Sequence, residues 1–71
     1  MKLKEIIKYI PVYESISISE NLRHITTVPA KKSMNDRESL LGEHLNKTVG
    51  TIDTVRAKEG ATININIYKR G

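Results

Sequence analysis

The segment that most limits the possible folds alternates strictly between apolar and hydrogen-bonding residues. Residues 61–68 read ATININIY, and residues 15–19 read SISIS. Because successive side chains of a β-strand point to opposite faces, the isoleucines of each segment share one face. The Ser, Thr, Asn and Tyr side chains share the other face. Two such segments predict a mostly antiparallel sheet with one apolar face and one polar face.

The remaining elements follow from spacing. Leu3, Ile6, Ile7 and Ile10 have the spacing of one helix face, and Pro11 ends the helix that they predict. A helix this short is unstable alone, so we expect it to dock on the sheet. The predicted strands are residues 12–19, 22–28, 49–57 and 61–68, with turns at residues 20–21 and 59–60 and a frayed tail at residues 69–71.

A second helix is predicted between the two strand pairs. Asn35, with Glu38 three residues later, resembles a capping box at its start, and Asn46 ends it. Arg37 is placed among the charged residues of its outer face. The apolar face is formed by Leu40, Leu41 and Leu45. The order α-β-β-α-β-β predicts one α+β domain over residues 1–71: two layers, with both helices on one face of a four-stranded sheet.

The small size of the chain bears on stability and assembly. It has 71 residues and no cysteine, Phe or Trp, which excludes disulfides and thiolate zinc sites. The two histidines, His24 and His44, have no second ligand at helical metal spacing, so we expect no metal. Because an aliphatic core in so short a chain is marginal, we predict a homodimer or a larger assembly.

The charge balance leaves two interpretations open. The net charge is +4, with 12 Lys and Arg against 8 Asp and Glu. Such a chain attracts an anionic partner, or it has only a solvated basic surface. Nucleic acid is the less favoured partner, because the chain lacks the clustered aromatic residues on which RNA-binding sheets stack bases. With no apolar run near 18 residues and no signal-peptide pattern, we expect a cytoplasmic protein without a membrane partner.

No catalytic or cofactor-binding motif is present, and we predict that the chain is not an enzyme and has no cofactor. One candidate anion site leads into the second helix. It comprises Lys31, Lys32, Ser33 and Arg37. Free N–H groups and the helix dipole favour phosphate or carboxylate at such a place. Capping by the helix's own residues, without any ligand, remains the alternative.

The polar face of the last strand is the second candidate site. Asn is depleted in strands, so Asn64 and Asn66 on one face require a reason. Their amides both donate and accept, and Tyr68 adds a flat ring beside them. Such a face suits a base, a ribose or an extended peptide. A water-facing sheet, or an edge strand that pairs with a second copy, is the alternative.

The opening helix LKEIIKYI, followed by a strand, a leucine-bearing helix and a strand pair, resembles small proteins encoded by phages and mobile elements of low-GC Gram-positive bacteria. The resemblance implies a non-enzymatic protein that counters host defence, as an oligomer that sequesters a nucleotide-like immune signal. The candidate residues above would then contact that ligand. The alternatives are a protein–protein inhibitor of a host defence factor, such as a CRISPR effector, and a weak nucleic-acid-binding accessory protein.

Overall fold

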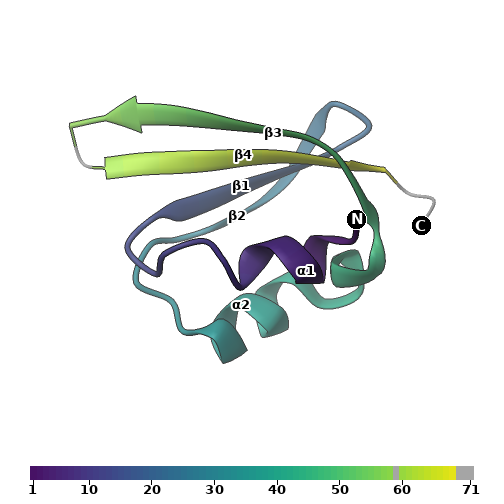
Figure 1. The fold of residues 1–71 in the computed structure, drawn as a ribbon, viewed down its shortest axis with the longest axis horizontal. Helices are drawn as coiled ribbons and strands as arrows, with labels where there is room; N and C mark the ends of the chain where they lie inside the picture. Colours follow the sequence, from purple (N-terminus) through teal and green to yellow (C-terminus); the bar gives the residue numbers. More distant parts are fainter. Residues whose placement is uncertain (59, 69–71) are drawn as a thin grey trace.

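Four strands form one mixed sheet in the order β2-β1-β4-β3 (Figure 1). The computed structural model describes residues 1–58 and 60–68, so the predicted turn residue Glu59 and the predicted tail at residues 69–71 lie outside the described residues. The strands are β1 (Ser15–Glu20), β2 (Arg23–Val28), β3 (Thr48–Ala57) and β4 (Gly60–Tyr68). The helices are α1 (Leu3–Ile7), α2 (Met34–Leu41) and the 3-10 helix η1 (Gly42–Asn46).

The strand pairing confirms an α+β chain and adds a parallel pair that was not predicted. β1 pairs with β2, and β3 with β4, in antiparallel hairpins, whereas the central strands β1 and β4 run parallel. The segment from β2 through α2 and η1 to β3 carries the chain across the sheet. The second hairpin therefore joins the first through β4, which leaves β2 and β3 as the two edges.

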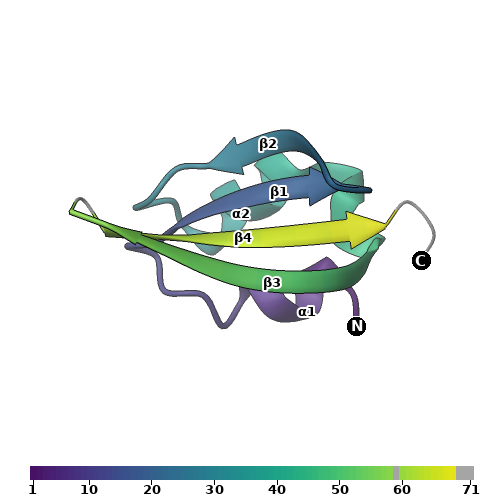
Figure 2. The same ribbon diagram turned by 90° about the horizontal axis from the view of Figure 1, so that it is seen from above.

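The alternation of the strands decides which residues enter the core. Ile16 and Ile18 of β1 are fully buried beside Ile65 and Ile67 of β4, as the sequence pattern predicts. Both helices lie on this side of the sheet in Figure 1, and Figure 2 looks onto the opposite face, with the helices behind the strands. We call these faces the helix side and the polar side. The buried apolar residues of the described part are Leu3, Ile7, Ile16, Ile18, Val28, Leu41, Ile65 and Ile67.

The first helix is shorter than predicted but docks as expected. It ends at Ile7 instead of continuing to Ile10, and both Leu3 and Ile7 are buried. Glu5 accepts a hydrogen bond from the backbone N–H of Lys2 at 3.0 Å, which satisfies one free donor at the start of the helix. Packing against the sheet therefore stabilises a helix too short to persist alone.

The start and the faces of α2 differ from the prediction. Ser33, rather than Asn35, caps the helix, and its Oγ accepts from Asp36 N at 3.2 Å. The buried residues are Arg37 and Leu41. Leu40, which was predicted to lie on the apolar face, is 51% exposed. The prediction that Arg37 lies on the outer face is wrong, because its guanidinium group bonds to carbonyl groups beyond the end of α1.

Candidate binding surface

Arg37 is held inside the fold. It is 2% exposed, and its guanidinium donates to the carbonyl oxygens of Ile7, Ile10 and Pro11 at 2.9, 2.6 and 2.7 Å. Burial lowers the pKa of Arg37 from its usual value, and the charge of Glu14 partly offsets this effect. These three carbonyl groups are at and beyond the C-terminal end of α1, and Ile7 O and Pro11 O also accept from Ile10 N at 3.3 Å and Glu14 N at 3.1 Å. Arg37 therefore joins α2 to this segment.

The other residues of the predicted anion site lie in the loop before α2. Lys31 is exposed, has a left-handed backbone with φ 68°, and donates its N–H to Val12 O at 2.5 Å. Lys32 is half-buried, and the Ser33 hydroxyl is occupied by the cap of α2. With Arg37 turned inward, the basic groups that this predicted site offers to a ligand are those of Lys31 and Lys32.

The residues of the second predicted site lie on the polar side of the sheet. Asn64 and Asn66 pair with Ser17 and Ser19 of β1 across the parallel ladder. Asn66 is 7% exposed and accepts a hydrogen bond from Leu22 N at 2.8 Å, while its Nδ2 has no partner among the described residues. The ring of Tyr68 lies over Gly50, where a Cβ atom would come within 2.1 Å of Cε2. One face of that ring is therefore covered.

The described structure does not bring the two predicted sets of residues together. The loop at residues 29–33 follows Val28, which pairs with Ile16 near the start of β1, whereas Asn66 pairs with Ser19 near its end. Figure 1 shows this loop and the C-terminal end of β4 at opposite ends of the molecule. A single small ligand therefore does not contact Lys31, Lys32 and Tyr68 at once in this arrangement.

The outer side of β3 is one of the two edges of the sheet. At its start, Val49 N donates to Met1 O at 2.8 Å and Leu3 N donates to Lys47 O at 3.0 Å. The segment at residues 1–3 thus covers the beginning of this edge. From residue 51 to 57, no described strand pairs with the outer side of β3. We call this stretch the free edge.

A bulge in β3 determines which backbone N–H groups point to the free edge. The register of β3 against β4 shifts between Val49 and Thr51, which resets the alternation of its backbone groups. Thr54 N donates to its neighbour Asp53 Oδ1 at 3.0 Å, so this N–H does not need an acceptor on β4. Because N–H groups alternate between the two sides of a strand, those of Ile52, Thr54 and Arg56 face the free edge.

The free edge also exposes aliphatic side chains on both faces of the sheet. Ile52 pairs with Ile65 and so lies on the helix side, whereas Val55 pairs with Thr62 and lies on the polar side. Each is 51% exposed. Edge strands are usually blunted by lysine, proline or short length, because an open edge invites another strand. β3 has 10 residues and no lysine or proline, and the Asp53 carboxylate accepts from the outward-facing N–H of its neighbour Thr54.

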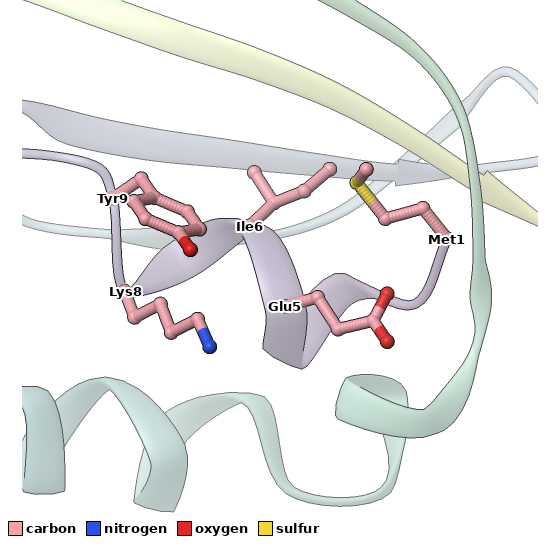
Figure 3. A pocket seen from close by; sticks show the side chains of 5 residues that line it. All are labelled: Met1, Glu5, Ile6, Lys8 and Tyr9. Atoms are coloured by element: carbon pink, nitrogen blue, oxygen red, sulfur yellow. The ribbon is translucent and has the colours of Figure 1, made fainter.

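A shallow hollow of about 380 Å³ lies beside α1, next to the covered start of β3. It is lined by Met1, Glu5, Ile6, Lys8 and Tyr9 (Figure 3). In Figure 3 the apolar side chains of Met1 and Ile6 point toward the sheet. The Lys8 ammonium group lies 5.4 Å from the centroid of the Tyr9 ring, within the range of a cation–π contact. The hollow thus combines the apolar side chains of Met1 and Ile6 with one acidic and one basic side chain, those of Glu5 and Lys8.

One cluster of titratable groups has a structural role. Lys47 Nζ lies 2.5 Å from Glu20 Oε2 and 2.9 Å from His44 Nδ1. The cluster joins the end of β1 to the segment that leads into β3, and it is partly buried. The contact of Lys47 with His44 adds η1 to the elements that this cluster joins.

Among residues 1–58 and 60–68, no three His, Asp or Glu side chains are grouped closely enough to hold a metal ion. None of the helices in that part has the length and apolar character needed to cross a membrane. Comparison of the chain with family models, curated proteins and solved structures finds no match.

Analysis of the sequence missed the free edge, although a signal for it was present. Residues 51–55 read TIDTV, in which Ile52 and Val55 are three apart. An odd spacing places them on opposite faces of a strand, unlike the isoleucines of β4. Charged residues such as Asp53 within a strand are typical of a sheet edge rather than of its centre.

Proposed function

We propose that this chain is a non-catalytic binding protein that recognises another polypeptide by adding an extended segment of it to the free edge of β3. The observation that carries the proposal is the uncovered stretch at residues 51–57, which has aliphatic side chains half-exposed on both faces. In strand addition, main-chain hydrogen bonds give affinity and alternate side chains give specificity. The free edge offers both.

The proposal takes up the protein-inhibitor alternative drawn from the sequence. A host defence factor is therefore the first class of partner to test. A protein that works by binding needs no catalytic group, which agrees with the engagement of Arg37 and His44 in structural contacts. The homodimer or larger assembly expected from the small core remains a prediction, and it does not require the free edge.

Replacement of Thr54 by proline tests the proposal. Proline removes the N–H that faces the free edge, and proline is tolerated on an edge strand when that side faces solvent. We expect the Thr54→Pro protein to keep its fold and to lose capture of its partner from cell lysate. Thr54→Val is the matched control, because valine keeps the N–H and favours strands. Affinity capture with mass spectrometry, with circular dichroism for the fold, measures both results.

The comparison between the two variants decides the outcome. A partner captured by the wild-type and Thr54→Val proteins, but not by a folded Thr54→Pro protein, supports strand addition at β3. A partner captured equally by all three proteins shows that the interface lies elsewhere. In that case, the polar side of the sheet becomes the surface to test.

A further inference from the structure

We infer that the segment bound at the free edge is an antiparallel strand of a different protein, with a basic residue opposite Asp53 and an acidic residue opposite Arg56, and that Asp53 acts as a gate. The inference rests on the proposed function and specifies the partner. It follows from the hydrogen bond between Asp53 and Thr54, the faces on which the charges lie, and the direction of the segment at residues 1–3.

The gate is the bond from Thr54 N to Asp53 Oδ1. An incoming strand needs this N–H for one of its own carbonyl groups, so the Asp53 carboxylate competes with it. A partner with Lys or Arg opposite Asp53 offers the carboxylate a cation in exchange, and cross-strand pairs of opposite charge are favourable. A partner without that cation must displace the carboxylate unaided. Asp53 therefore selects among incoming strands.

The direction of the incoming strand is set by its neighbour on the same edge. Lys2 forms an antiparallel bridge with Thr48, so the segment at residues 1–3 already runs antiparallel to β3. A partner strand in the same direction starts opposite Ala57 and ends opposite Thr51, next to Met1. Its last apolar side chain on the helix side then approaches the hollow that Met1 and Ile6 line.

The side chains of β3 predict which residue types the partner strand carries opposite them, taken from the partner's N-terminus to its C-terminus. On the helix side, we expect an acidic residue opposite Arg56, a β-branched residue opposite Thr54 and an aliphatic residue opposite Ile52. On the polar side, Val55 calls for an aliphatic residue and Asp53 for a basic residue. Taken in order from the position opposite Arg56 to the position opposite Ile52, these residues give the sequence Glu-Val-Thr-Lys-Ile.

A second copy of this chain does not supply that pattern. When two copies join their β3 edges in an antiparallel pair about a two-fold axis, the polar sides of both sheets lie on the same face of the joined sheet. Asp53 of one copy therefore meets only polar-side residues of the other. β3 has no basic residue on the polar side and no acidic residue on the helix side. A register centred on Asp53 would even set the two carboxylates against each other, which is destabilising. The charges of the free edge therefore fit a different protein.

Synthetic peptides test the pattern directly on the wild-type chain. One peptide carries Glu-Val-Thr-Lys-Ile, and its control, Lys-Val-Thr-Glu-Ile, has the same composition with the charges exchanged. A second control, Glu-Val-Pro-Lys-Ile, loses the N–H opposite Thr54. With two cross-strand charge pairs reversed, we expect the exchanged peptide to bind about tenfold more weakly in an NMR titration. The proline peptide should bind more weakly still.

Two variants test the gate and the charge pairing. The doubly substituted protein Asp53→Lys, Arg56→Glu should prefer Lys-Val-Thr-Glu-Ile by a similar factor, which a purely apolar interface would not do. Asp53→Ala removes the acceptor for Thr54 N, so it should bind Glu-Val-Thr-Ala-Ile more tightly than the wild-type protein does. Both positions are exposed, so neither variant is expected to impair folding.

The outcomes separate this inference from the proposed function. Equal affinity for the two charged peptides, with loss of binding for the proline peptide, overturns the pattern and leaves strand addition standing. No binding of any peptide at about millimolar concentration overturns the pattern as well, while the Thr54 variants still test whether β3 is the interface. Preference for Glu-Val-Thr-Lys-Ile that reverses in the double variant supports the inference.

Discussion

Replacement of Arg37 by alanine is expected to lower the free energy of unfolding by about 3 kcal/mol, because a hydrogen bond to a charged group contributes about 1.5–3 kcal/mol and the substitution removes several. The guanidinium group donates to three carbonyl oxygens, of Ile7, Ile10 and Pro11. After its removal, Ile7 O and Pro11 O still accept from Ile10 N at 3.3 Å and Glu14 N at 3.1 Å. The Ile10 carbonyl is left without a donor among the described residues, and an unpaired buried polar group costs about 1–3 kcal/mol. Small domains have only about 5–15 kcal/mol of stability in total, so this loss is a large fraction of it.

Arg37→Lys is the matched control for this prediction. Lysine keeps the charge but not the planar fork of donors, so it should recover part of the lost stability. Urea unfolding followed by circular dichroism measures both variants. A loss below about 1 kcal/mol for Arg37→Ala, which is typical of a surface substitution, would show that the guanidinium group does not hold α1 and α2 together.

Substitution of Ile18 and of Ile52 by alanine should have opposite consequences for stability, large for Ile18 and small for Ile52. Ile18 is fully buried in a central strand, and Ile18→Ala is expected to cost about 2–5 kcal/mol through lost burial and a cavity. Ile52 is 51% exposed at the free edge. Ile52→Ala should therefore cost about 1 kcal/mol or less, because much of its side chain is already in water. Urea unfolding of the two variants gives the comparison.

This comparison has a functional meaning as well as a structural one. A small effect of Ile52→Ala on stability, together with weaker binding of the Glu-Val-Thr-Lys-Ile peptide, would assign the side chain to recognition rather than to the core. If both substitutions destabilise the protein equally, Ile52 belongs to the core, and the apolar part of the proposed surface is lost.

The strands were predictable because their pattern is local. The alternation around Ile16, Ile18, Ile65 and Ile67 is enough to predict which face of the sheet is apolar, and these four side chains are buried. The parallel pairing of β1 with β4 depends on which strands meet after the chain crosses the sheet. No local pattern encodes that choice, since Ile, Ser and Asn suit a parallel or an antiparallel neighbour.

The errors at α2 have a common physical cause. Arg37 was expected in solvent because charged residues are rarely buried alone. Its partners are backbone carbonyl groups 26 to 30 residues away, which no spacing rule can find. The buried stripe of α2 is formed by Arg37 and Leu41, four residues apart, and Leu40 lies outside it. The predicted anion site contained Arg37 for the same reason.

Amide hydrogen exchange, observed by NMR with and without the Glu-Val-Thr-Lys-Ile peptide, tests the central claim most directly. In the free protein, the N–H groups of Ile52 and Arg56 should exchange rapidly, while those of Asp53 and Val55, directed to β4, should be protected. At saturating peptide, Ile52, Thr54 and Arg56 should become protected, and their neighbours should change little. Binding of the peptide without protection of these three amides would contradict strand addition at β3.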